Sequence, residues 1–203
     1  GGKGMKGTTT RDEEWVEHLF VATNHNYILF FTEKGQCYWL KVYEIPEGGR
    51  LARGRAIVNL IEIDKDDHIK AFVPVKTLED EEYVQKHSII MATKEGQIKK
   101  TSLEAYSRPR RDGIIAINIK DGDSLLGAEL TDGDSNIILA NKNGRAIRFH
   151  ESEAREMGRN TSGVRGMNLG KGDEVVDMVV IRNTHEATVL AISENGFGKR
   201  SLA

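Results

Sequence analysis

Three arginine-rich segments contain the residue types in this chain best suited to a specific chemistry, which is contact with phosphate. In the central segment Arg108, Arg110 and Arg111 surround Pro109. Proline stiffens the loop and favours an extended conformation for the residue before it, so these arginines should be displayed outward. The other two segments carry matching arginines: Arg50, Arg53 and Arg55 in the first, and Arg155, Arg159 and Arg165 in the third.

Other reactive side chains do not form a catalytic or metal-binding pattern. Tyr106 could act as a nucleophile beside the arginines, but a tyrosine packed under the loop with its hydroxyl hydrogen-bonded is the favoured interpretation. The six histidines are scattered, and Cys37 should be packed and inert in a strand. The acidic runs 64–67 and 79–82 fit solvated turns better than calcium loops. No hydrolase, zincin or Walker A motif is present, so catalysis within this chain is not expected.

The arginine-rich segments belong to a unit that recurs at a period of roughly 50 residues. Each copy begins at a glycine turn and continues into a short strand. The arginine-rich segment follows, and the copy ends on Gly-x-x-x-x-Asn and an aliphatic residue. The central copy spans 93–119. The turn glycines are Gly35, Gly96, Gly144 and Gly196, the loop glycines are Gly54, Gly113 and Gly163, and the asparagines are Asn59, Asn118 and Asn168.

Short apolar runs on either side of the turn glycines predict antiparallel hairpins. Long helices are not expected, and the segments 102–106 and 151–155 could each form one helical turn. An insertion around 78–86 should be a surface loop. About four strands per copy favour a propeller-like ring or a β-array. The predicted strands are 16–22, 27–32, 36–42, 88–93, 97–100, 136–140, 145–149, 188–192 and a last one from 197 onward.

Composition restricts the class of protein further. The chain has 203 residues, of which 38% are hydrophobic and 30% charged, as is ordinary for a globular protein. No apolar run approaches the roughly 20 residues that cross a bilayer. A single cysteine excludes an internal disulfide framework, and the chain does not start with a signal sequence. We therefore expect a reducing, cytoplasmic setting.

The distribution of charge is more informative than its total. The net charge of −2 by itself argues against a nucleic-acid partner. Along the chain, however, the sign alternates in phase with the repeat: residues 94–120 carry +4, residues 121–141 carry −5 and residues 142–171 carry +4. In a ring, the basic segments should fall on one edge and form a curved basic track. The alternative is that these arginines are solvated and balance neighbouring acids.

The segments 35–59, 100–119 and 144–169 resemble the blade sequences of the DNA gyrase A C-terminal domain. That family folds as a β-pinwheel, a propeller-like disc of six blades that exchange strands, and duplex DNA bends around its basic perimeter. The resemblance implies an all-β fold of four-stranded blades. Residues 1–203 would form a single domain that is truncated at both ends, with about four of the six blades present.

The first seven residues are expected to form a flexible glycine and lysine strap. Gly1-Gly2-Lys3-Gly4 resembles the last four residues of the gyrase box, Gln-Arg-Arg-Gly-Gly-Lys/Arg-Gly. This box remnant favours gyrase over topoisomerase IV. The G-x-G-x-x-G spacing from Gly2 to Gly7 is not a dinucleotide fingerprint, because no strand precedes it and no helix follows.

The resemblance implies a function without catalysis in this chain: sequence-tolerant binding and wrapping of duplex DNA, which directs negative supercoiling by an ATP-dependent type IIA topoisomerase. The alternatives are the equivalent domain of topoisomerase IV and a propeller that binds protein. The implied DNA contacts are Lys3, Lys6, Arg50, Arg53, Arg55, Lys99, Lys100, Arg108, Arg110, Arg111, Arg145, Arg148, Arg155, Arg159, Arg165, Lys199 and Arg200.

The resemblance also implies partners and a location. The partners would be duplex DNA, the remainder of gyrase A as a homodimer, and gyrase B, without a membrane. The location would be cytoplasmic and nucleoid-associated. No cofactor or metal is expected in this domain, whereas ATP and Mg²⁺ would act in other domains of the holoenzyme.

Overall fold

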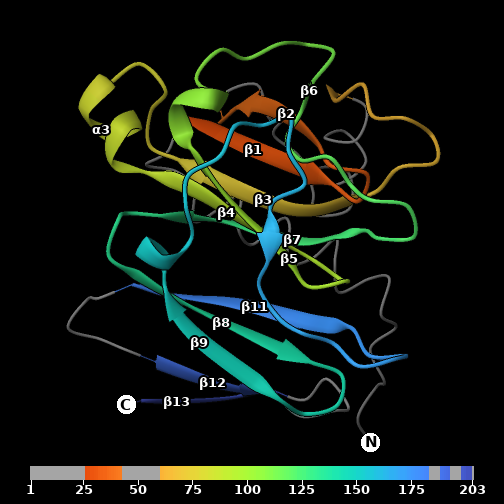
Figure 1. The fold of residues 1–203 in the computed structure, drawn as a ribbon. Helices are drawn as coiled ribbons and strands as arrows, with labels where there is room; N and C mark the ends of the chain where they lie inside the picture. Colours follow the sequence, from red (N-terminus) through yellow and green to blue (C-terminus); the bar gives the residue numbers. More distant parts are fainter. Residues whose placement is uncertain (1–25, 43–59, 183–187, 193–197, 203) are drawn as a thin grey trace, which may run out of the picture.

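Antiparallel sheets that follow one another in chain order make up the fold (Figure 1). The computed structural model describes residues 26–42, 60–182, 188–192 and 198–202, with only the backbone described for the last two segments. The predicted strand at 16–22, the strap at 1–7 and the first copy's Gly54 and Asn59 lie outside the described residues.

The first sheet has the order β3-β1-β2-β6 and the second the order β10-β5-β4-β7, and a third has the order β11-β8-β9. Two more strands form a separate hairpin. The strands of the first sheet are β1 (Tyr27–Thr32), β2 (Gln36–Lys41), β3 (Ile69–Val75) and β6 (Ile114–Ile115). Those of the second are β4 (Ser88–Thr93), β5 (Gln97–Ser102), β7 (Leu125–Thr131) and β10 (Val164–Arg165). The remainder are β8 (Ser135–Asn141), β9 (Ala146–His150), β11 (Val175–Arg182), β12 (Thr188–Ile192) and β13 (Gly198–Leu202).

Three of the hairpins close through the same turn chemistry. The predicted turn glycines Gly35, Gly96 and Gly144 all have a positive φ, between 84° and 90°. Such a backbone conformation is costly for any residue with a Cβ, which explains why glycine recurs there. The N–H of each glycine donates to the carbonyl three residues earlier, on Thr32, Thr93 and Asn141 respectively. The sequence prediction of hairpins is thereby confirmed at these three turns.

Strands are exchanged between neighbouring sheets, which is the feature that distinguishes a pinwheel from a simple propeller. β6 follows β5 in the chain but pairs with β2, with Cys37 opposite Ile114. In the same way β10 follows β9 but pairs with β5, with Ile98 opposite Val164. The carbonyl of the turn glycine in each hairpin that receives an exchanged strand accepts two further N–H groups. The carbonyl of Gly35 accepts from residues 116 and 117, and that of Gly96 accepts from residues 166 and 167.

Adjacent blades share buried layers, and the central strand β4 is apolar on both faces. Ile89 and Met91 point into the cluster between the first and second sheets, whereas Ile90 and Ala92 point into the cluster between the second and third. Successive side chains of a strand alternate between its faces, so a strand between two cores must be apolar throughout. This accounts for the run from Ser88 to Thr93, in which every residue is buried.

Three aspartates in corresponding positions, just before β3, β7 and β11, each bind the turn of the hairpin in the same sheet. Asp67 accepts the N–H of Lys34, and Asp123 accepts that of Glu95 at 2.9 Å. Asp173 accepts the N–H of Asn143 and also the side-chain amide of Asn141. The expectation that the run 64–67 is a solvated turn is therefore wrong for Asp67, which is buried because its carboxylate satisfies main-chain donors.

The predicted helical turns occur, and the predicted surface loop is partly helical. η3 (Leu103–Tyr106) and η4 (Glu151–Glu153) are short 3₁₀ helices. The insertion around 78–86 contains the α-helix α3 (Glu81–Lys86), which is a correction to the expected loop. Asp80 caps this helix by accepting the N–H of Tyr83, and acidic residues in the first turn with Lys86 in the last suit the helix dipole.

Replacing Gly163 with Ala should detach the exchanged segment, because a Cβ there would lie 2.2 Å from the carbonyl oxygen of Ile98. Gly122 is a matched control, since it has a similar φ of 80° but open space where a Cβ would lie. We expect Gly122→Ala to cost about 1–2 kcal/mol of unfolding free energy and Gly163→Ala at least about 2 kcal/mol more. Urea denaturation of both variants tests this, and equal losses would contradict it.

Candidate nucleic-acid interface

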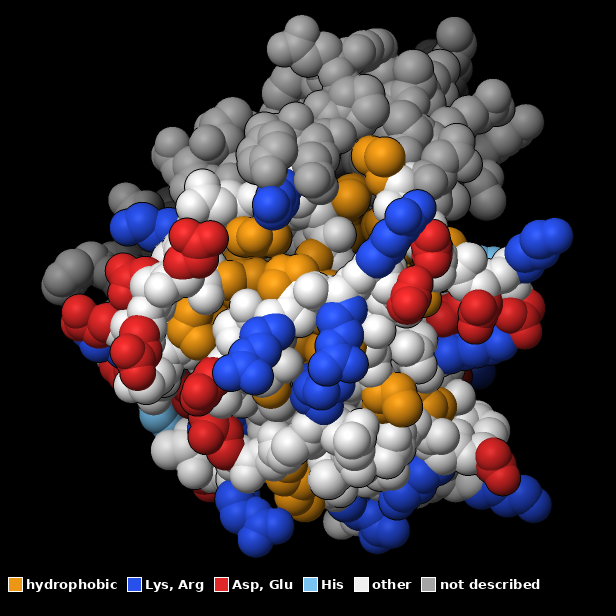
Figure 2. Space-filling model, turned by 90° about the horizontal axis from the view of Figure 1, so that it is seen from above, with side chains coloured by type: hydrophobic (Ala, Val, Ile, Leu, Met, Phe, Trp, Pro, Cys, Tyr) orange, Lys and Arg blue, Asp and Glu red, His pale blue; other side chains and the backbone are white. Residues whose placement is uncertain are grey.

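Two arginine arms are described, and both lead into exchanged strands. We define arm 2 as residues 107–119 and arm 3 as residues 155–169. Arg108, Arg110 and Arg111 are exposed on arm 2, and Arg155 and Arg165 are exposed on arm 3. Figure 2 views the molecule from the top of Figure 1: lysine and arginine side chains lie in the middle of this face and also around its edge, and acidic side chains lie mainly to the left and right.

Most of these arginines are not neutralised by neighbouring acids. Arg111 forms an ion pair with Glu62 at 3.1 Å, but both side chains are largely exposed, at 86% and 53%. Such exposed pairs contribute little and can be replaced by another anion. Among the described residues, no carboxylate lies within ion-pair distance of the remaining predicted arginines, which are Arg108, Arg110, Arg145, Arg148, Arg155, Arg159 and Arg165.

Arms 2 and 3 lie against each other. The N–H of Asn118 on arm 2 donates to the carbonyl of Thr161 on arm 3 at 2.9 Å. The guanidinium of Arg159 donates to the carbonyl of Ile115, also at 2.9 Å. These two bonds place arms 2 and 3 side by side. The curved basic track along one edge stays a prediction.

Lys99 does not belong to the exposed surface, which corrects its inclusion among the predicted DNA contacts. Its side chain is only 1% exposed. The amine donates to the main-chain carbonyls of Ala116 at 2.5 Å, Arg159 at 2.6 Å and Thr161 at 3.3 Å. Lys100 is half-buried, and its amine donates to the carbonyl of Glu151 at 3.0 Å. Both lysines thus hold the backbone of neighbouring segments.

A comparison of the copies shows what signal could have identified Lys99 as an interior residue. It lies three residues after its turn glycine, a position occupied by Tyr38 in the first copy and Ile147 in the third. Tyr38 is buried and Ile147 is partly buried. The repeat therefore marks this position as one that faces inward, whereas the basic residue type by itself suggested the surface.

The environment of Lys99 changes its acidity. Burial, together with the nearby Arg159 guanidinium, lowers the pKa of Lys99 to about 8. The amine is therefore still mostly protonated at neutral pH. An ammonium has three N–H donors, which match the three carbonyl acceptors, whereas a neutral amine would leave one of them without a donor.

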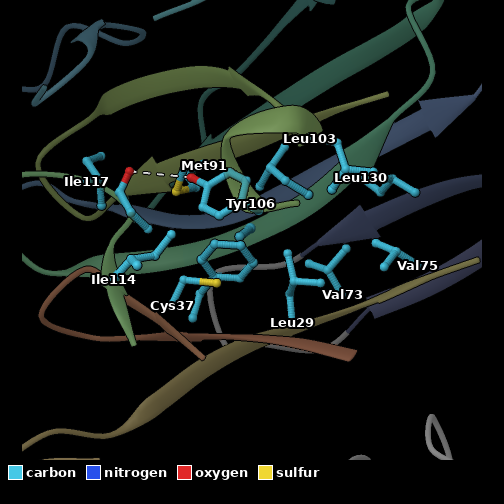
Figure 3. Close-up of a cluster of buried hydrophobic side chains, with 14 of the residues drawn as sticks. Leu29, Cys37, Val73, Val75, Met91, Leu103, Tyr106, Ile114, Ile117 and Leu130 are labelled. Atoms are coloured by element: carbon cyan, nitrogen blue, oxygen red, sulfur yellow. Dashed lines mark hydrogen bonds between the residues drawn. The ribbon is translucent and has the colours of Figure 1, made fainter. Parts of the chain in front are cut away.

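Tyr106 and Cys37 are core residues, as the sequence predicted (Figure 3). The Tyr106 hydroxyl donates to the carbonyl of Ala116 at 3.5 Å, and its ring meets Phe31 edge to face. Burial raises the pKa of the Tyr106 hydroxyl and that of the Cys37 thiol well above their ordinary values. A thiol or a phenol reacts as a nucleophile mainly in its anionic form. Because burial disfavours both anions, neither Cys37 nor Tyr106 is suited to that role.

The structure also locates the remaining predicted residues. Arg145, at the turn before β9, and Arg148, on β9, are exposed. Lys199 and Arg200 lie in β13, where only the backbone is described. Among the described residues there is no group of three or more His, Cys, Asp or Glu side chains that could hold a metal, and no helix long and apolar enough to span a membrane. Outside the described residues lie Gly1, Gly2, Lys3, Gly4, Lys6, Arg50, Arg53 and Arg55.

Exchanged strands and exposed arginine arms define the class as the β-pinwheel C-terminal domains of DNA topoisomerases. Solved structures that share the fold include two such domains. The C-terminal domain of DNA topoisomerase IV superposes with a TM-score of 0.72 at 31% identity, over 87% of this chain and 53% of that one. The DNA gyrase A C-terminal domain superposes with a TM-score of 0.68 at 27% identity, over 88% and 55%.

Sequence comparison narrows the class to one family. The family model described as the DNA gyrase C-terminal domain, beta-propeller, matches residues 26–76, 87–132, 135–182 and 187–203, so the chain belongs to this family. The DNA gyrase A protein of Salmonella typhimurium is 42% identical over 203 residues, and that of Escherichia coli is 43% identical over 201. The matches cover 100% and 99% of this chain but 22% of each relative, so the chain spans about a fifth of their length.

The lowered pKa of Lys99 predicts a pH-dependent stability difference between the wild type and Lys99→Met. Between pH 8 and the ordinary value of 10.5, the unfolded chain keeps the Lys99 proton that the folded protein has lost. Raising the pH through this window therefore favours the folded wild type, by at most about 1.4 kcal/mol per pH unit. Urea unfolding at pH 7, 8, 9 and 10 should show the wild type gaining stability relative to the variant. A difference that stays constant with pH would refute the assignment.

Proposed function

We propose that this chain binds duplex DNA on its arginine arms and bends the duplex around the outer edge of the blades. The observation that supports this most directly is the exposure of arginines on two arms that touch each other, most of them without a neighbouring carboxylate. Membership of the DNA gyrase C-terminal domain family points to the same polymer. Lys99 is excluded from the contact surface because its side chain is buried.

The arrangement suits phosphate contact more than recognition of bases. Contacts to the phosphate backbone position a protein on DNA without reading its sequence. Smooth bending of 20–30 base pairs through 40–90° costs roughly 1–6 kcal/mol, so a wrapping surface needs cations distributed along the path. Arms that project from successive blades provide this distribution, and the acidic side chains on both sides of the basic face would repel the duplex from other paths (Figure 2).

The wider context follows from the relatives. Because they are DNA gyrase A proteins of which this chain covers about a fifth, we propose that it works as the non-catalytic part of an ATP-dependent type II topoisomerase. Its partners would be the rest of gyrase A as a homodimer and gyrase B, in the cytoplasm and on the nucleoid. ATP and Mg²⁺ would act in the other domains, and the direction of wrapping would set negative supercoiling.

A role in topoisomerase IV is the second candidate. The observation that favours it is the fold, since the topoisomerase IV domain superposes with the higher of the two TM-scores, 0.72 against 0.68. Matches to gyrase A proteins over the full length of this chain, at 42–43% identity, favour gyrase. Relaxed plasmid with the reconstituted holoenzyme distinguishes the two, because only gyrase would introduce negative supercoils.

The proposal predicts a salt-dependent affinity that arm 2 controls. Each phosphate neutralised contributes roughly 0.9 to the slope of log affinity against log salt. The triple variant Arg108→Ala, Arg110→Ala, Arg111→Ala should therefore bind an unrelated set of duplexes more weakly and reduce the slope by about 2–3. Fluorescence anisotropy between about 50 and 300 mM salt, a range that brackets physiological ionic strength, measures both quantities.

The matched control is Lys65→Ala, Lys76→Ala, Lys86→Ala, which removes three exposed lysines outside the two arms. This control should keep the slope of the wild type, although its net charge equals that of the arm 2 variant. A slope that falls equally in both variants would show that only total charge matters. An unchanged affinity in the arm 2 variant would refute the proposed interface.

A further inference from the structure

We propose that Lys99 and Arg159 form an inter-blade clamp that positions arms 2 and 3 relative to each other, so that DNA meets their arginines as one track. This inference rests on the proposed function, because it concerns the geometry of the same surface. Lys99 acts from the interior and does not touch DNA, since its side chain is 1% exposed.

The clamp is built on two cations and four main-chain carbonyls. From inside, the Lys99 ammonium binds Ala116 of arm 2 and both Arg159 and Thr161 of arm 3. From outside, the Arg159 guanidinium binds the carbonyl of Ile115 on arm 2 at 2.9 Å. Lys99, which lies on β5, thus binds both arms, and Arg159, which lies on arm 3, binds arm 2.

The cations are needed because the carbonyls converge. Three carbonyl oxygens lie within 3.3 Å of one nitrogen, so their partial negative charges point toward a common centre. A carbonyl that loses its donor away from water costs free energy, and the Lys99 amine is the donor to the carbonyl of Arg159. The carbonyls of Ala116 and Thr161 also accept from Tyr106 and Asn118, so the amine adds a shared donor to both. Removing the amine should therefore let the arms separate, because these three carbonyls would then lose their common donor.

The clamp lies at the junction between the second and third blades, and it is not a general requirement of the fold. At the preceding junction the equivalent position is Tyr38, and the loop glycine Gly113 packs directly on its ring. At Lys99 the equivalent loop glycine, Gly163, packs against the carbonyl of Ile98 and the Cβ of Lys99, and the Lys99 amine reaches the carbonyls of the two arms. Two blades can therefore pack together with a tyrosine at this position. Lys99 is not required for the blades to fold, and its proposed role is to position the two arms.

The clamp lies close to the proposed DNA contacts. Within arm 2, the carbonyl of Arg110 accepts the N–H of Gly113 at 3.1 Å, and the clamped Ala116 follows three residues after Gly113. On arm 3, Arg159 itself supplies a clamped carbonyl. A shift between the arms would therefore change the spacing of the arginines that a single duplex must contact.

The test uses the whole chain with Lys99→Met, which keeps the length of the side chain without its donors, and Lys99→Tyr, which carries the residue of the preceding junction. Lys86→Met on α3 is the charge-matched control. Binding is measured with a duplex of about 12 base pairs, a little over one helical turn, and one of about 40 base pairs. Amide hydrogen exchange at Asn118, whose N–H donates to Thr161, reports the junction without DNA.

Both Lys99 variants should lose about tenfold or more in affinity for the long duplex and less than about twofold for the short one, because only the long duplex must contact both arms at once. Exchange at Asn118 should accelerate in both, while Lys86→Met behaves like the wild type. A Lys99→Tyr variant that binds the long duplex normally would overturn the clamp, since packing alone would then be sufficient.

Equal losses for the two duplexes would also overturn it, because they would indicate a general loss of structure or a direct contact. If the wild type binds neither duplex, the proposed function fails, and the exchange measurement still decides on the junction. In that case unchanged exchange at Asn118 in Lys99→Met shows that the amine does not hold the arms together.

Discussion

Main-chain hydrogen bonding between blades is the constraint on which the rest of this structure depends. β6 and β10 are each two residues long, too short to persist alone, and each is held by the hairpin of the preceding blade. The carbonyls of Gly35 and Gly96 extend this pairing by accepting two N–H groups each. Further along, the N–H of Leu125 donates to the carbonyl of Glu33 and that of Val175 to the carbonyl of Lys94, so β7 and β11 are also tied to the blade before them. A blade is therefore complete only when its neighbour is present.

The same exchange determines where the cations lie. Each arm runs from the hairpin of its own blade to the preceding blade and back. Within the arm, the backbone of β6 or β10 forms hydrogen bonds with the preceding sheet. The side chains between the fixed ends remain free to face solvent, which is where Arg108, Arg110 and Arg111 are found. The backbone of an arm thus stabilises the fold, whereas its exposed side chains are available to phosphate. Lys99 and Arg159 bind the backbone where arms 2 and 3 meet.

Some elements could be predicted because their signals are local. The hairpins at Gly35, Gly96 and Gly144 follow from alternating apolar strands and a turn that needs a positive φ. The burial of Tyr106 and Cys37 agrees with the prediction from residue type, since a tyrosine body and a free thiol usually pack in the interior. The sequence does not predict helix α3, because a six-residue helix carries too little periodicity, although Asp80 in the capping position is a visible signal. The burial of Asp67 cannot be predicted locally, because its partner, the N–H of Lys34, lies 33 residues away.

The sequence by itself determined the repeat, the hairpins, the alternation of charge and the resemblance to the gyrase family, since each depends on residues close together in the chain or on a spacing that recurs between copies of the unit. Only the tertiary structure decided which sheet accepts each exchanged strand and which cations face solvent. Lys99 and Arg110 are the same kind of residue in one copy, yet one binds three carbonyls in the interior and the other is exposed. The physical reason is that burial depends on the neighbouring blade, whose carbonyls reach Lys99 from about 60 residues further along the chain.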